Sequence, residues 1–136
     1  MSERRFEEVD HTADIAIRVW GGSLAELFAN AAYGMACQIA DAQTVDLSVE
    51  ERIQLEADDV EMLLVDWLGE LLFLGEPEQV VFVAFDIVEV TPHVLSALAR
   101  GGPVSEYLAH IKAVTFSQLD VRKTAEGFET VIVFDV

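Results

Sequence analysis

The chain has 136 residues, enough for one domain built around a single hydrophobic core, and we predict one domain over residues 1–136. Apolar residues make up 52% of it and charged residues 24%, a balance that excludes an intrinsically disordered chain. Asp and Glu number 25 against 8 Lys and Arg, so the formal net charge is −17. This charge argues against stable binding of nucleic acid or anionic membranes and favours a metal cation or a basic protein partner, although it also fits a surface that only maintains solubility.

The sequence shows no sign of export or of a membrane anchor. Cys37 is the only cysteine, which excludes an intrachain disulfide and a cysteine-based zinc cluster. The first ten residues carry charges throughout, unlike a signal peptide, and the longest apolar run, at 80–85, is far shorter than the ~18 residues of a membrane-spanning helix. We therefore expect a cytoplasmic protein. Cys37 lies off the apolar stripe of its helix with no base nearby in sequence, so we interpret it as a bystander rather than a nucleophile.

The first half of the chain predicts two strands and two helices. Residues 14–20 alternate between apolar and polar, and residues 45–57 do so with one interruption at Glu51. A helix is expected from Ser23, which has a capping-box partner in Glu26, to Ile39. A second helix is expected after Asp58, with Glu61 at the same capping spacing, and it ends at Gly75 and Pro77.

The outer face of the second helix combines acidic and apolar residues. Asp66 and Glu70 point away from its apolar stripe, as expected for a solvated face, whereas Trp67 lies on the stripe and belongs in the core. Met62 and Phe73 also fall on the outer side, close to Gly69. Two large apolar side chains in such a position indicate either a contact surface or a face covered by a loop.

The second half of the chain reads as consecutive strands. We predict strands at 80–90 and 94–99 joined by a turn at 91–93, a break at 101–103, and a closing hairpin of 110–121 with 128–134. Strands therefore come early, then bracket two helices, then run in series. This order predicts an α+β fold, a two-layer sandwich with a mostly antiparallel or mixed sheet and two main helices on one face. It argues against a doubly wound nucleotide-binding fold.

No familiar catalytic motif stands out. The chain lacks a G-x-S-x-G nucleophile elbow and a glycine-rich phosphate loop, and its histidines (His11, His93 and His110) are dispersed. A hydrolase that uses paired carboxylates stays open, although no pair of acids is marked out for that role.

The two ends of the chain hold the most concentrated polar chemistry. Asp10 to Asp14 brings two carboxylates, a hydroxyl and an imidazole just before the first clear strand, and the last strand stops at Asp135 and Val136. If these two strands pair, Asp14, Asp135 and the Val136 terminus would cluster, and a hard cation such as calcium or magnesium would relieve their repulsion. The alternative is that Asp14 caps a turn and the terminus is solvated.

Four ordered motifs resemble the archease family and together cover most of the chain. They are Asp10 to Ile15 followed by Gly22 to Phe28, Leu63 to Phe73, Ile111 to Phe116, and Phe134 to Val136. The chain differs from the family pattern at Phe116-Ser117, where Tyr-His is frequent, and at Gly69, where Asn is common.

The resemblance implies a small, non-catalytic accessory protein of the GTP-dependent RNA ligase that splices tRNA. Archeases promote guanylylation of this ligase and let it turn over repeatedly, and they bind calcium. Carried over to this chain, the calcium ligands are Asp14, Asp135 and a backbone or terminal oxygen of Val136, with magnesium as the alternative ion. The competing interpretations are a chaperone-like modulator of another RNA-modifying enzyme and a metal-dependent hydrolase.

Two further residues in these motifs have open roles. Lys112 is the one base in a recognisable motif, where it would contact a phosphate or the partner, or form a local salt bridge with a carboxylate. His11 would orient Asp14 through a hydrogen bond or serve as a structural histidine.

Overall fold

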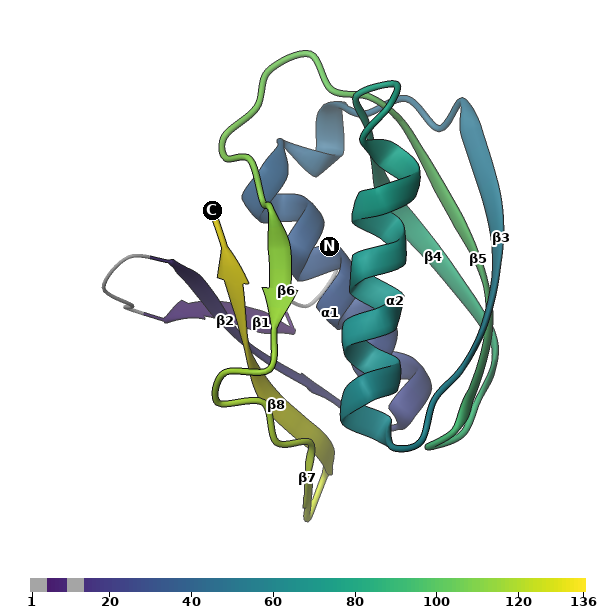
Figure 1. Ribbon diagram of the computed structural model, residues 1–136, viewed down its shortest axis with the longest axis vertical. Helices are drawn as coiled ribbons and strands as arrows, with labels where there is room; N and C mark the ends of the chain where they lie inside the picture. The colour runs from purple at the N-terminus through teal and green to yellow at the C-terminus, as the bar shows by residue number, and fades with distance from the viewer. Residues whose placement is uncertain (1–4, 10–13) are drawn as a thin grey trace.

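A computed structural model describes residues 5–9 and 14–136 (Figure 1). Within these residues it contains two α-helices, a short 3-10 helix and eight strands. In chain order the elements are β1 (Phe6–Val9), β2 (Ile15–Gly21), α1 (Leu24–Ile39), η1 (Ala42–Thr44), β3 (Val49–Glu56), α2 (Val60–Gly75), β4 (Val80–Val90), β5 (Val94–Pro103), β6 (Ala113–Thr115), β7 (Arg122–Thr124) and β8 (Gly127–Asp135).

The strands form two antiparallel sheets with the helices between them (Figure 1). One sheet has the order β1-β2-β8-β6, with β7 also paired to β8, and the other has the order β3-β5-β4. Helix α1 contacts β2 of the first sheet and β4 of the second, and α2 contacts β3, β4 and β6. The predicted α+β class, the antiparallel pairing and the placement of both helices on one face of a sheet are confirmed. The sequence pattern predicts a single sheet, but the strands form two. Strand β3 pairs with β5 of the β4–β5 hairpin, whereas β8 pairs with β2.

The predicted closing hairpin is shorter than its sequence pattern. Strand β7 pairs with β8 across the turn at 125–127, but only residues 113–115 of the stretch 110–121 form a strand. Gln118 has a φ of 62°, a left-handed conformation that ends an extended run, and Leu119 N–H donates to Phe116 O at 3.1 Å. The apolar residues of this stretch therefore cover the core from a looped segment.

The helices begin at side-chain caps. Ser23 Oγ accepts a hydrogen bond from Glu26 N–H, as predicted. The second helix starts one residue later than expected, because Asp59 rather than Asp58 caps it, with Oδ1 2.8 Å from Met62 N. Glu61 reaches instead to Val121 N–H at 2.9 Å, which ties the loop before β7 to the start of α2. No helix in the described ranges is long and apolar enough to cross a membrane.

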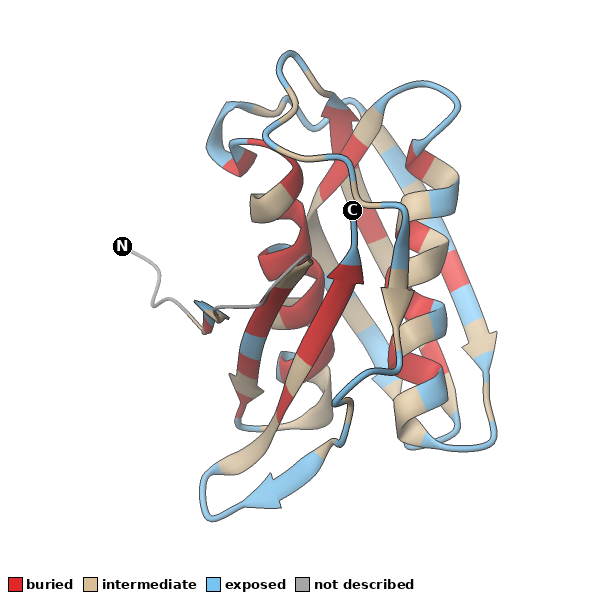
Figure 2. Ribbon diagram, turned by 60° about the vertical axis from the view of Figure 1, so that its left-hand side comes forward, coloured by how far each residue is buried: buried red, intermediate tan, exposed pale blue. Residues whose placement is uncertain are grey.

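The core lies where the helices meet the inner faces of the sheets (Figure 2). Trp67 is fully buried, as its position on the apolar stripe of α2 predicts. Its Nε1 donates to Phe28 O at 3.0 Å, and its ring meets Phe85 edge-on at 5.8 Å. This one side chain therefore joins α2 to α1 and to β4 with its polar group satisfied.

Cys37 is half-buried on α1, one turn beyond Tyr33. The Tyr33 ring packs edge-on against Phe6, with centroids 6.3 Å apart. Burial is the largest cause that raises the pKa of the Tyr33 phenol above its ordinary value of 10.0. The nearby Cys37 and then Asp41 raise this pKa further by smaller amounts. The neighbour of the thiol is thus a phenol that stays neutral at physiological pH.

Gly34 and Gly69, in the interiors of the two helices, have different surroundings. A Cβ added at Gly34 of α1 would lie 2.8 Å from Ile17 Cδ1 and 3.1 Å from Phe6 Cγ, so the close approach of β1 and β2 explains this glycine. A Cβ added at Gly69 of α2 would meet nothing within 4 Å. Packing among the described residues therefore gives no reason for a glycine at position 69.

We expect Gly69→Ala to stabilise the protein by about 0.5–1 kcal/mol, because glycine in a helix interior costs that much relative to alanine. The matched control is Gly34→Ala, which has the same propensity gain but crowds Ile17 and Phe6 and should be at least about 1 kcal/mol less stable than Gly69→Ala. Urea denaturation of both variants measures the difference. Equal free energies of unfolding would contradict the packing argument.

We expect the Tyr33 phenol to ionise above pH 10.0, the value for an unperturbed tyrosine. Because the folded state raises this pKa, the stability that it contributes is present below the unfolded pKa and is lost as the pH rises through the folded one. Ultraviolet absorbance of tyrosinate in the parent, minus that in Tyr33→Phe, isolates this group. A midpoint at or below 10.0 would contradict the assignment.

Candidate functional site

The pairing of β2 with β8 brings the two sequence-predicted acids to one end of a sheet. The register ends with Ile15 opposite Phe134. Because the strands are antiparallel, Asp14, which precedes Ile15, and Asp135, which comes after Phe134, both lie just beyond this last pair. Asp135 also pairs with Ala113 of β6, and its main-chain oxygen accepts the Lys112 N–H at 2.8 Å. Three segments that are distant in sequence therefore meet here, namely the start of β2, the end of β8 and the start of β6.

The donor atoms at this end of the sheet are oxygens. Asp135 and Val136 are exposed and Asp14 is half-exposed, so all three are open to solvent. Within residues 5–9 and 14–136, no three His, Cys, Asp or Glu side chains gather in a way that could hold a metal ion. Among the described residues, the donors open to a cation here are the carboxylates of Asp14 and Asp135 together with main-chain oxygens. Such a set fits a hard ion of the calcium or magnesium type.

The histidines do not extend this set within the part of the chain that the structure describes. His93 lies in the turn between β4 and β5, with Nδ1 3.3 Å from Ala57 O, and His110 stacks on Tyr107 with ring centroids 4.1 Å apart. His11 and Asp10 lie outside the described residues, so the proposed orientation of Asp14 by His11 stays a prediction.

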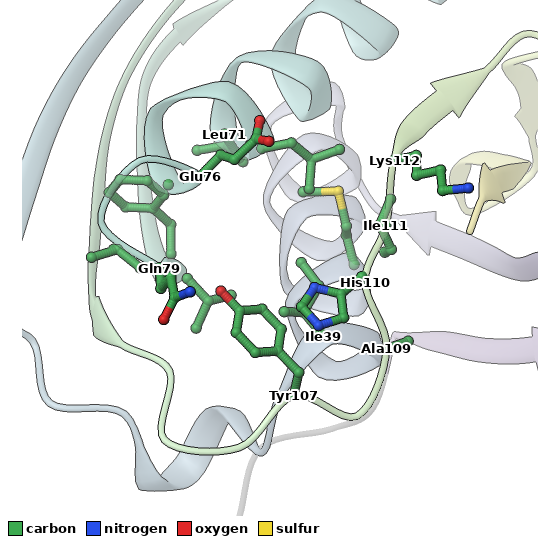
Figure 3. A pocket seen from close by; sticks show the side chains of 15 residues that line it. Ile39, Leu71, Glu76, Gln79, Tyr107, Ala109, His110, Ile111 and Lys112 are labelled. Carbon is green, nitrogen blue, oxygen red and sulfur yellow. The ribbon is translucent and has the colours of Figure 1, made fainter.

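A cavity of about 410 Å³ lies between the C-terminal ends of α1 and α2 and the segment before β6 (Figure 3). Met35, Ile39 and Leu71 are among its apolar lining residues, and the stacked rings of Tyr107 and His110 lie along one side of it. The segment is held against α1 by the Leu108 N–H, which donates to Ile39 O at 2.7 Å. Sequence reasoning missed this cavity because residues 104–109 have no periodic pattern and residues 110–112 belong to a predicted strand.

A second hollow, of about 520 Å³, lies over α2. Helix α2 contributes most of its lining, with Gly69 and Phe73 among the residues involved, and the other walls come from Leu55 of β3 and residues 112–114. Phe73 is 70% exposed and Met62 is 37% exposed, so the predicted outer position of both side chains is confirmed, and no loop among the described residues buries them.

Lys112 lines both hollows. The local salt bridge considered for it from the sequence is not found among the described residues, where the ion pairs are formed by arginines (Arg5, Arg18, Arg100 and Arg122). Its main-chain N–H is nevertheless fixed by Asp135 O, which places this residue between the two hollows and the end of β8.

Comparisons with known proteins agree with the motifs. The model of the archease protein family matches residues 6–136. The protein archease of Methanosarcina mazei is 39% identical to this chain over 98% of the chain and 97% of its own length. The archease of Archaeoglobus fulgidus is 36% identical over 97% of the chain and 99% of its own length.

Solved structures share the fold. The solution structure of protein 1598 from Methanobacterium thermoautotrophicum has a TM-score of 0.81 and 30% identity, and the match covers 98% of this chain and all of that one. The crystal structure of an archease from Thermotoga maritima, described as a possible chaperone, has a TM-score of 0.68 and 19% identity over 96% of each chain. The family match over nearly the whole length, together with the relatives above 30% identity, shows that this chain belongs to the archease family.

Proposed function

We propose that this protein is a non-catalytic accessory factor that activates the GTP-dependent RNA ligase of tRNA splicing, promoting its guanylylation and multiple turnover, with a bound calcium ion. The observation that carries the proposal is the β2–β8 register, which brings Asp14 and Asp135 to one end of a sheet in a chain of the archease family. Membership of the archease family supports the accessory role, and the register supports a site that Asp14 and Asp135 share.

The ion would be held by the carboxylates of Asp14 and Asp135 and by a backbone or terminal oxygen of Val136. Asp135 is exposed, so its side-chain carboxylate is open to a cation, while its main-chain oxygen accepts the Lys112 N–H. The ion would supply positive charge that offsets the repulsion between the carboxylates. Magnesium is the alternative occupant.

The net charge of −17 gives the protein a physical route to its partner. An RNA ligase must hold GTP and RNA phosphates, so the mouth of its active site is expected to be electropositive. Long-range attraction would speed the encounter between the two proteins and would weaken as salt screens it. The same acidic surface would compete with spent RNA product for the basic groups of the ligase, which favours turnover.

The main alternative is a chaperone-like modulator of another RNA-modifying enzyme, and the description of the Thermotoga maritima archease as a possible chaperone favours it. A metal-dependent hydrolase would use the same carboxylates for chemistry. The carboxylates of Asp14, before β2, and Asp135, at the end of β8, are joined by no third acid, histidine or cysteine among the described residues, and we therefore prefer the non-catalytic role.

We expect Asp14→Asn and Asp135→Asn each to weaken calcium binding at least tenfold, about 1.4 kcal/mol, because each removes a charged oxygen ligand. Isothermal titration with calcium and then magnesium measures the affinities. Glu126→Gln, which removes an exposed acid at the β7–β8 turn, is the control and should bind as the parent does. Residues appended after Val136 should also weaken binding if its terminal oxygen is a ligand. Unchanged affinity in both aspartate variants would remove the site.

We expect the protein to raise the yield of its cognate RNA ligase well above one product per enzyme when RNA ends are in excess. Joined RNA is measured over time at low and moderate salt, and the gain should fall as salt rises because the encounter is electrostatic. The protein alone, incubated with a phosphoester substrate, tests the hydrolase alternative. A ligase yield that stays at one equivalent with the protein present would defeat the proposal.

A further inference from the structure

The outward face of α2 is not explained by the metal site. Met62, Asp66, Gly69 and Phe73 follow one another at spacings of four, three and four, which places them on one side of the helix. Phe73 lines the hollow over α2 yet is 70% exposed, and Met62 is 37% exposed. An aromatic side chain this exposed on an ordered helix loses the free energy that its burial would provide.

Gly69 lies at the centre of this face and lowers the stability of the helix, and packing among residues 5–9 and 14–136 gives no reason for it. A Cβ at position 69 would meet nothing within 4 Å, so the space directly above the glycine is open. The half-buried Val65 and Leu72 line the same hollow beside it. An open position between apolar groups leaves room for a side chain from another molecule to reach the helix closely.

The charges around the hollow define what would fit it. Asp66, Glu70 and Glu76 line it, and Lys112 is the one base among its lining residues. Within a chain of net charge −17 this edge attracts cationic groups, while Val65 and Phe73 offer apolar contact. RNA is a poor occupant because these carboxylates would repel its phosphates.

We propose that the hollow over α2 docks a basic, amphipathic segment of a partner protein. An apolar side chain of this segment would lie over Gly69 against Phe73, and its Arg or Lys residues would face Asp66, Glu70 and Glu76. The inference deepens the proposed function, because an accessory protein needs a surface that binds its partner. It concerns the docking surface alone and involves no ligand of the metal site.

The probe is a synthetic peptide of 14 residues that has leucines three and four positions apart and arginines elsewhere. It is titrated into the isotope-labelled protein at physiological salt, and backbone amide shifts are followed by NMR. We expect the shifts to concentrate on residues 65–76 and 112–114. A peptide with glutamates in place of the arginines should not bind, because the hollow is acidic.

Two variants test the hollow without relying on a loss of fold. Gly69→Leu fills the open space with no change of charge, and we expect it to weaken the binding of the arginine peptide at least tenfold while its thermal midpoint does not fall below that of the parent. Phe73→Ala should weaken binding at least threefold. Its control is Val88→Ala on β4, which truncates a side chain of similar exposure (65%) and should bind as the parent does.

Shifts that concentrate on another face, an equal affinity in Gly69→Leu and the parent, or no binding of the arginine peptide would each overturn the docking proposal. The same variants in the ligase assay separate this inference from the proposed function. If the parent activates the ligase and Gly69→Leu activates it equally well, the docking proposal is refuted and the proposed function stands. If the parent binds the peptide but does not activate the ligase, the proposed function is refuted and the docking proposal stands.

Discussion

The antiparallel pairing of β2 with β8 is the contact on which the rest of the molecule depends. It joins opposite ends of the chain, and the entropy of closing so long a loop must be offset by burial. The cross-strand pair of Ile17 with Ile132 is fully buried, and so is Val19 opposite Thr130, whose hydroxyl accepts the Asp120 N–H at 3.4 Å. These pairs form the inner face on which α1 packs, so the sheet and the helix stabilise one another.

The same register decides where the charges of the two chain ends lie. A slip of one residue would turn the apolar side chains of the strand that slips, Ile17 of β2 or Ile132 of β8, away from the core, so burial fixes the register. Asp14 and Asp135, which continue these strands beyond the last pair, are therefore brought to one place by the packing of apolar residues elsewhere. Both lie at an exposed end of the sheet, where water and salt screen charge, so the core can place two acids there.

Local signals in the sequence predicted the local structure well. Apolar periodicity and capping residues located both helices, and the turn at 91–93 located the β4–β5 hairpin, since neighbouring residues determine these features. The cap at Asp59 was misplaced by one residue because Asp58 offers the same chemistry. The division into two sheets, the loop at Gln118 and the two hollows depend on contacts between distant segments, which periodicity does not encode.

Lys112 connects the two proposed sites. Its main chain is fixed by the Asp135 oxygen at the end of β8, and its side chain lines the hollow over α2. A basic segment docked in that hollow would lie beside residues 112–114, and its charges would interact with those at the end of β8. A cation held by Asp14 and Asp135 would then weaken the binding of a basic segment through charge repulsion. Because coupling between two binding events is reciprocal, the docked segment would weaken cation binding by the same free energy. The acids that line the hollow, Asp66, Glu70 and Glu76, would attract the basic segment and act against that opposition.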